Sequence, residues 1–208
     1  MKVWVGMPAA VILACTVLIA GTKYVSSYHN PQASLKSLTG KKIACFVVIP
    51  SEELRSAREE TVASALIERG IDAIAGYTIL PGDLVKDREK AKAFLKKAGV
   101  AGAVMLRLVN DQEAQKYSTT TMGGWYSQPY YGSFSGYWNY GWSEVYIHET
   151  TWTERVVTLE TLIYSIESDQ LIWAGRSDTS SPKDIKKFVK DLAEATGKEL
   201  RKAGLVAK

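Results

Sequence analysis

The stretch IACFVVIPSEELRSAREETVASALIERG, residues 43–70, decides the fold. It opens with an unbroken apolar run from Ile43 to Ile49, which has the length of one strand and is typical of a strand covered on both faces. Ser51 follows as an N-cap, with two glutamates in the first turn where the helix dipole favours negative charge, and Gly70 is a helix stop. A buried strand followed directly by an amphipathic helix predicts the first half of a parallel β-α-β unit.

The strand and helix alternation continues beyond this stretch. Residues 71–80 and 100–109 are predicted strands, and residues 87–98 form a predicted helix that ends at Gly99. Parallel neighbours need crossover connections of this kind, which are right-handed almost without exception. We therefore expect the three strands to lie parallel in one sheet.

The pattern changes in the C-terminal third. Residues 154–166 form a long predicted strand rich in Val, Thr, Leu and Ile, a tight turn follows at 167–169, and residues 170–177 return as an antiparallel partner. The last element is a basic amphipathic helix, with Ser181 as its N-cap and Asp184 closing a capping box. The predicted class is α/β: an open mixed sheet, β-α-β-α-β, followed by an antiparallel β-hairpin and a C-terminal helix.

Residues 1–22 are predicted to be a signal peptide or membrane anchor, because a lysine at position 2 precedes an uncharged, strongly apolar stretch. Three fates are open. Cys15 ends the lipobox-like sequence ILAC and would be lipidated; cleavage near Ala20 or Gly21 would release a soluble protein; or the uncleaved segment would anchor the chain. We expect an exported protein of the bacterial periplasm, attached to the membrane through a lipid or anchor.

The remaining sequence divides into a linker and one domain. Residues 23–41 are polar and lack periodicity, which predicts a linker containing His29. A single α/β domain is expected over 42–206, since a chain of 208 residues suits one core. Cys45 lies in the first strand, where buried packing is expected rather than a reactive thiol, and with Cys15 lipidated or removed no intramolecular disulfide can form.

An insertion at 117–146 has an unusual composition. It holds more than half of the chain's 6 Trp, 11 Tyr and 4 Phe residues, interleaved with Gly, Ser and Thr. Because Gly and Pro disfavour a helix and aliphatic residues are few, we expect an exposed loop or a protruding hairpin tip that meets a partner surface. The candidate partner-binding residues are Trp125, Tyr126, Tyr130, Tyr131, Trp138, Tyr140 and Trp142.

The sequence gives little indication of catalysis, metals or cofactors. Of its 2 histidines, His148 is interpreted as a strand-surface residue. The turn from Pro50 to Glu53 places a proline and two carboxylates where a phosphate would bind, which excludes dinucleotide and P-loop sites. The pair Glu59 and Glu60 is interpreted as solvating charge on a helix surface. The 26 basic and 22 acidic residues are interspersed, so nucleic-acid binding is not indicated.

Several stretches together resemble a known group of proteins. They are the lipobox-like ILAC, the strand IACFVVI at 43–49, the segment from Leu66 to Val109, and ETLIYSIESDQLIWAGRSDTS at 160–180 with its basic helix. These are similar to uncharacterised bacterial envelope proteins, often described as lipoproteins, with a small α/β domain and a Gly/Tyr/Trp-rich insertion. The resemblance implies an envelope compartment and this fold, and no known activity.

The leading hypothesis is a non-enzymatic cell-envelope protein, a binding or assembly module that presents its aromatic loop to a protein partner or to a glycan such as peptidoglycan. Two alternatives stay open. One is an enzyme of unknown reaction, which requires a pocket with perturbed titratable groups. The other is a structural envelope protein whose aromatic loop has no ligand.

Overall fold

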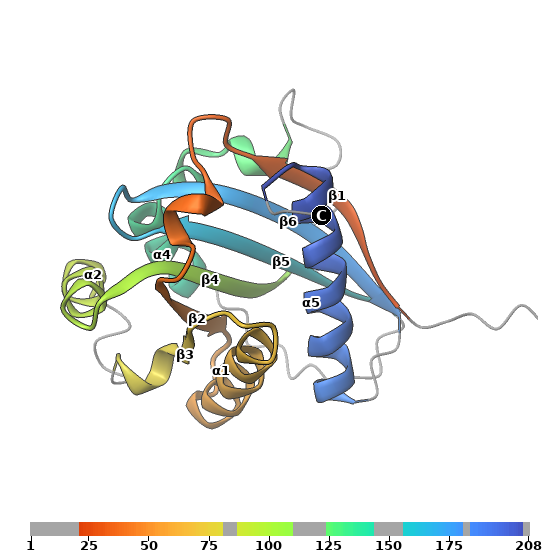
Figure 1. Ribbon diagram of the computed structural model, residues 1–208. Helices are drawn as coiled ribbons and strands as arrows, with labels where there is room; N and C mark the ends of the chain where they lie inside the picture. The colour runs from red at the N-terminus through yellow and green to blue at the C-terminus, as the bar shows by residue number, and fades with distance from the viewer. Residues whose placement is uncertain (1–20, 81–86, 110–123, 144–155, 181–183, 206–208) are drawn as a thin grey trace, which may run out of the picture.

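Six strands form one mixed sheet in the order β1-β6-β5-β4-β2-β3 in the computed structural model, which describes residues 21–80, 87–109, 124–143, 156–180 and 184–205 (Figure 1). The strands are β1 (Thr22–His29), β2 (Lys42–Val48), β3 (Ala73–Ala75), β4 (Val100–Val109), β5 (Val156–Ser165) and β6 (Gln170–Ser180). β2 is parallel to β3 and β4, whereas β4, β5, β6 and β1 are joined by antiparallel pairings.

Helices cover both faces of this sheet. The α-helices are α1 (Glu52–Ile67), α2 (Arg88–Lys97), α4 (Phe134–Ser143) and α5 (Ile185–Lys202), and the 3-10 turns are η1 (Leu35–Leu38), η2 (Gly76–Thr78), η4 (Trp125–Ser127) and η5 (Pro129–Tyr131). α1 and α5 pack side by side on one face, and α2 and α4 pack on the other (Figure 1). The predicted class is confirmed: an open mixed sheet with the order β-α-β-α-β, an antiparallel hairpin and a C-terminal helix.

The alternation of β2 divides its side chains between the two layers. Cys45 and Val47 pack with α1 and α5, whereas Phe46 and Val48 pack with the residues of α2 and α4. Cys45 is fully buried, as predicted. Burial and the nearby Glu59 carboxylate raise the pKa of the Cys45 thiol, which keeps the thiol protonated and inert.

The second parallel strand is much shorter than the predicted 71–80. Only Ala73–Ala75 pairs with β2, and the chain then turns into η2. A side chain takes the place of the missing strand: the Glu59 carboxylate accepts the backbone N–H of Val47 (3.1 Å) and of Tyr77 (2.6 Å). Glu59 is fully buried, so its interpretation as a surface charge is wrong. Burial raises the pKa of Glu59 to about 7, although both hydrogen bonds lower it.

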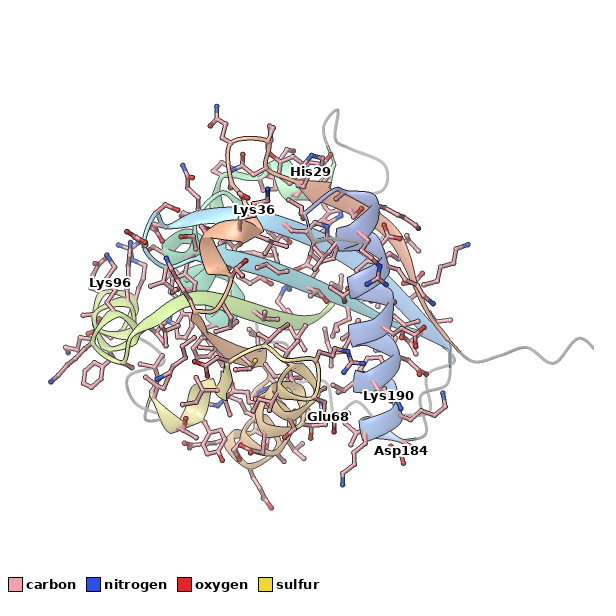
Figure 2. The ribbon with its side chains drawn as sticks, in the orientation of Figure 1. His29, Lys36, Glu68, Lys96, Asp184 and Lys190 are labelled. Atoms are coloured by element: carbon pink, nitrogen blue, oxygen red, sulfur yellow. The ribbon has the colours of Figure 1, made fainter. Side chains whose placement is uncertain are left out.

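The linker predicted at 23–41 is also wrong, because β1 and η1 occupy it. β1 pairs antiparallel with β6 and forms one edge of the sheet. Tyr24 makes an edge-to-face contact with Trp173 (ring centroids 5.3 Å apart), and its hydroxyl lies 2.7 Å from the Thr196 hydroxyl on α5. His29 is therefore the exposed last residue of a strand (Figure 2). Strand pairing and the contacts of Tyr24 hold in place a sequence with too few aliphatic residues to be recognised as a strand.

A β-bulge allows side chains of β1 to contact both layers. Tyr24 pairs with Ser177 and Ser26 pairs with Arg176, which leaves Val25 as an extra, exposed residue. An extra residue reverses the facing of all that follow it. Tyr24 consequently faces α5, whereas Ser26 and Tyr28 face the layer of α4.

Several sequence predictions concern residues outside the described ranges: residues 1–20 of the signal segment, with Cys15, the proposed cap Ser181, and His148. The described start of α5 has Asp184 as its N-cap (Figure 2), whose carboxylate accepts the Lys187 N–H at 2.9 Å. Asp184 thus caps the helix itself instead of closing a capping box. Among the helices that the structure describes, none is both long and apolar enough to cross a bilayer.

Candidate functional site

Residues 124–143, here called the aromatic segment, are not an exposed loop. They form η4, η5 and α4, and pack onto the sheet as part of the main hydrophobic core. Gly136 supports this packing, because a Cβ there would lie 3.0 Å from the Tyr130 carbonyl oxygen. The Asp169 carboxylate in the β5–β6 turn accepts the N–H of Ser135 (3.0 Å) in the first turn of α4. Tertiary contacts therefore override the poor helix propensity of glycine, and the predicted absence of helix is wrong.

The seven candidate aromatic residues divide into two groups. Three are buried: Trp125, Tyr131 and Trp138, with exposed fractions of 5%, 0% and 1%. The remaining four are only partly buried: Tyr126, Tyr130, Tyr140 and Trp142. The buried group belongs to the core, so the expectation that all seven face solvent is wrong, and only the second group is available to a partner.

Below the aromatic segment lies a fully buried carboxylate, Glu160 on β5. Its Oε1 accepts hydrogen bonds from the Tyr131 hydroxyl (2.6 Å) and from Nη2 of Arg176 (2.6 Å). Its Oε2 accepts from the Tyr137 hydroxyl (3.1 Å) and from Nε of Arg107 (3.1 Å). We call these five residues the Glu160 cluster.

The sheet register brings the charged members of the Glu160 cluster together. Glu160 pairs directly with Arg107 on β4 and with Arg176 on β6, so the three residues form one row across neighbouring strands. Cross-strand neighbours of opposite charge attract, and a buried ion needs hydrogen bonds to offset its loss of hydration. The row supplies the attraction, and the two tyrosine hydroxyls add further donors.

Aromatic rings close over the guanidinium groups of this row. Arg176 Cζ lies 4.4 Å from the ring centroid of Trp125, and Arg107 Cζ lies 5.1 Å from that of Tyr140. The Trp125 indole N–H donates to the Ser26 hydroxyl oxygen at 2.8 Å, which ties the aromatic segment to β1. The aromatic segment is therefore the cover of a charged layer.

Burial and the Glu160 carboxylate shift the pKa of three residues around it. Burial, followed by the Glu160 charge, raises the pKa of Tyr131 and of Tyr137, so both remain neutral donors. Burial by itself lowers the pKa of Arg176, but the charge of Glu160 and its hydrogen bonds more than offset this, and the net shift is upward. Arg176 is therefore charged beside two neutral tyrosine hydroxyls.

Two stacked tyrosine pairs lie at the partly exposed margin of the aromatic segment. Tyr28 of β1 stacks on Tyr126, with ring centroids 4.4 Å apart and planes 13° apart. Tyr130 stacks on Tyr140 at 3.8 Å and 18°. Both pairs border buried rings, since Trp125 contacts Tyr126 and Tyr131 contacts Tyr130. The sequence singled out Tyr126, Tyr130 and Tyr140 but missed Tyr28, which lay in the supposed linker.

The described residues contain no arrangement suited to a metal ion. Within these ranges, no three His, Cys, Asp or Glu side chains gather closely enough to hold one. In the described part of the chain, the deeply buried carboxyl groups are those of Glu59 and Glu160, which lie in different layers. Each uses both oxygens to accept hydrogen bonds from the protein.

The fold defines an α/β protein with a mixed six-stranded sheet. Two solved structures similar to it are PelC dodecamers from Paraburkholderia phytofirmans. One, a point variant in space group C2, is 14% identical over 82% of this chain and 94% of that chain, with a TM-score of 0.43. The other, in space group P6, is 13% identical over 82% and 91%, with a TM-score of 0.41. No family model matches the chain, and no curated protein matches it in sequence.

Proposed function

We propose that this chain is a non-enzymatic protein of the bacterial cell envelope that acts as a binding or assembly module. The two stacked tyrosine pairs carry this proposal. The sequence predicted an exposed aromatic loop. In its place, the tyrosine pairs form a small, ordered aromatic margin on the folded domain.

Because the stacked tyrosine side chains are already ordered, this margin is well suited to binding a partner. A tyrosine that already stacks on a neighbour loses little side-chain entropy when a partner covers it. Each tyrosine offers an apolar face together with a hydroxyl, which suits both a protein interface and the face of a sugar ring. Trp142, also partly exposed, extends the available aromatic area at the far end of α4. The proposed partners are an envelope protein or a glycan such as peptidoglycan.

The deeply buried carboxyl groups support a non-enzymatic role. A general base must reach the proton that it removes, usually within hydrogen-bond distance of the substrate. Glu160 is fully buried and accepts from two arginines and two tyrosines, and Glu59 is fully buried and accepts from two backbone N–H groups. Neither has an oxygen turned toward solvent.

The compartment is the second part of the proposal. The apolar N-terminal stretch with ILAC supports export to the periplasm and attachment to the membrane through a lipid on Cys15 or through the retained segment. Cys15→Ser should release the protein from the membrane fraction or block its processing. An intact mass showing an unlipidated start after Ala20 or Gly21 would contradict lipidation.

Partner capture tests the tyrosine pairs. The variant Tyr126→Ala/Tyr130→Ala removes one member of each pair, and Tyr77→Ala removes an equally polar, 36% exposed tyrosine next to the opposite edge strand, β3. Crosslinking and pull-down from envelope extract, with cosedimentation on purified peptidoglycan, should show loss of capture with the double variant only. Equal capture by both variants would show that the tyrosine pairs are not the binding surface.

A further inference from the structure

An arginine and a tryptophan from opposite faces of the sheet meet beyond the carboxyl end of β2. Arg55 lies in the first turns of α1 and is 3% exposed. Its Cζ lies 5.6 Å from the ring centroid of Trp142, near the end of α4. Within the described part of the chain, the buried Nη1 of Arg55 and the buried Nε1 of Trp142 have no hydrogen-bond partner.

Two neighbouring buried donors without acceptors require an explanation. Nearly all buried polar groups in folded proteins are hydrogen-bonded, and an unsatisfied one costs free energy, most of all when it is charged. By contrast, the Glu160 cluster, in the layer of α2 and α4, gives a carboxylate four donor side chains. Guanidinium and indole N–H groups donate only, so the group missing beside Arg55 and Trp142 is an acceptor.

The position of these donors is one at which α/β sheets bind ligands. The chain leaves β2 through α1 on one face and enters β4 through α2 on the other. Ligands of open α/β sheets bind outside the carboxyl ends of strands where the connections change faces in this way. The N-terminus of α1 lies at the same end of β2, and its dipole favours an anion.

We infer that Arg55 and Trp142 form a binding site for a carboxylate group, supplied by a small ligand. The guanidinium fork matches the two oxygens of a carboxylate. Neighbouring acids argue against a dianion such as phosphate: Glu52 lies 3.7 Å from Nη2 of Arg55, Glu53 shares the first turn of α1, and Glu59 interacts with Arg55 from one turn further along. Trp142 is only partly buried, so the site lies beside solvent. This site goes beyond the proposed function and does not depend on the tyrosine pairs.

The indole N–H of Trp142 reports directly on this site. The full chain labelled with ¹⁵N is titrated with acetate, with sodium chloride as the ionic-strength control and inorganic phosphate as the comparison anion. Trp142→Phe assigns the signal. The indole N–H of Trp125, already bonded to Ser26, is an internal reference. Acetate should shift the Trp142 signal saturably, phosphate should shift it less, and the Trp125 signal should stay in place.

Matched arginine variants then test the guanidinium. Arg55→Lys keeps the charge and loses the fork, and should weaken acetate binding about tenfold, since a charged hydrogen bond is lost. Arg69→Lys, an exposed arginine just beyond α1, should leave binding unchanged. If Arg55→Lys fails to fold, the titration of the parent chain still decides the question.

Three results would overturn the inference. They are an unmoved Trp142 signal, a shift that chloride reproduces, and an acetate affinity that Arg55→Lys leaves intact. An unmoved signal would mean that the chain itself supplies the acceptor. None of these results depends on partner capture, so failure of the carboxylate site and failure of the tyrosine pairs are distinguishable.

Discussion

The two faces of the sheet are built by different means. The layer of α1 and α5 is mainly aliphatic, and its apolar side chains pack together without requiring particular partners. The layer of α2 and α4 contains most of the large aromatic residues and, at its centre, the Glu160 cluster. An apolar layer tolerates exchange between residues of similar volume, whereas a buried charged layer is stable only when every member has its partner.

This contrast changes the role of the aromatic segment. As an exposed loop it would be dispensable for folding. As the cover of Glu160, Arg107 and Arg176, it supplies hydroxyl donors and ring faces that water would otherwise have to replace. The aromatic segment is therefore both a structural layer and, at its margin, the proposed binding surface.

Removal of the aromatic segment should have the largest effect. Replacing residues 124–142 by a Gly-Ser connector exposes the row of charges and one face of the sheet. Because domains are stable by only about 5 to 15 kcal/mol, we expect the cooperative thermal transition to disappear in circular dichroism. A melting temperature within a few degrees of the parent value would restore the interpretation as a dispensable loop.

Removal of the Glu160 charge should have the second-largest effect on stability. Glu160→Gln leaves Arg107 and Arg176 buried beside a neutral amide, which should cost about 3 to 5 kcal/mol in urea unfolding. The control is Glu167→Gln in the β5–β6 turn, where the carboxylate is 83% exposed and lies 3.9 Å from Lys41. That change should cost less than about 0.5 kcal/mol. If the two variants lost the same free energy of unfolding, the buried carboxylate of Glu160 would matter no more to stability than an exposed one.

The pH dependence of stability gives a further test of the difference between the two layers, because Glu59 is a buried acid in the layer of α1 and α5. Its pKa is raised by burial from the ordinary 4.5 to about 7, so the folded state favours the protonated form. The corresponding stability is fully present below pH 4.5 and is lost as the pH rises toward 7. Urea unfolding at several pH values should show this loss in the parent chain.

Glu59→Gln is the variant that isolates this effect. It should remove the pH-dependent component and cost about 1 to 3 kcal/mol, because an amide accepts through one oxygen only and leaves either the Val47 or the Tyr77 N–H unpaired. If parent and variant have the same pH profile, Glu59 does not titrate in this range.

The smallest effect is expected outside the aliphatic layer, on the solvent face of α5. Lys187 and Asp191 form an ion pair at 2.6 Å, with the lysine side chain 67% exposed. Exposed pairs of this spacing contribute about 0.3 to 0.5 kcal/mol, so Lys187→Ala should barely move the urea midpoint. A loss comparable to that of Glu160→Gln would show that burial is not what separates the two ion pairs.

Most of the fold followed from local signals. The start of α1 at the Ser51 cap and the hairpin of β5 and β6 agree with the sequence, because caps, apolar runs and turn residues act over a few positions. β1 escaped notice because TKYVSSYH carries little aliphatic character and depends on its partner strand. β3 is short because Glu59, from another element, takes over its hydrogen bonds.

The Glu160 cluster was missed although its signal is in the sequence. Arg107 is the single charged residue in VAGAVMLRLV, and Glu160 is the single charged residue in VVTLETLIYS. A single charge inside an apolar strand points to a buried partner. Which partner it is depends on the register between strands far apart in the chain, and composition alone does not contain that information.

The bulged strand β1 also bears on the order in which the chain folds. β1 is the first described strand, yet its strand partner is β6, and the Thr22 hydroxyl meets that of Thr179 across 157 positions of sequence. Contacts between such distant residues form late, after the entropy of closing a long loop has been overcome. Tyr24 hydrogen-bonds to α5, and Ser26 hydrogen-bonds to the aromatic segment. Docking of β1 therefore connects the strand to both layers in one step. A chain that crosses a membrane from its N-terminus would thus keep its leading strand unpaired until nearly all of the remainder has followed.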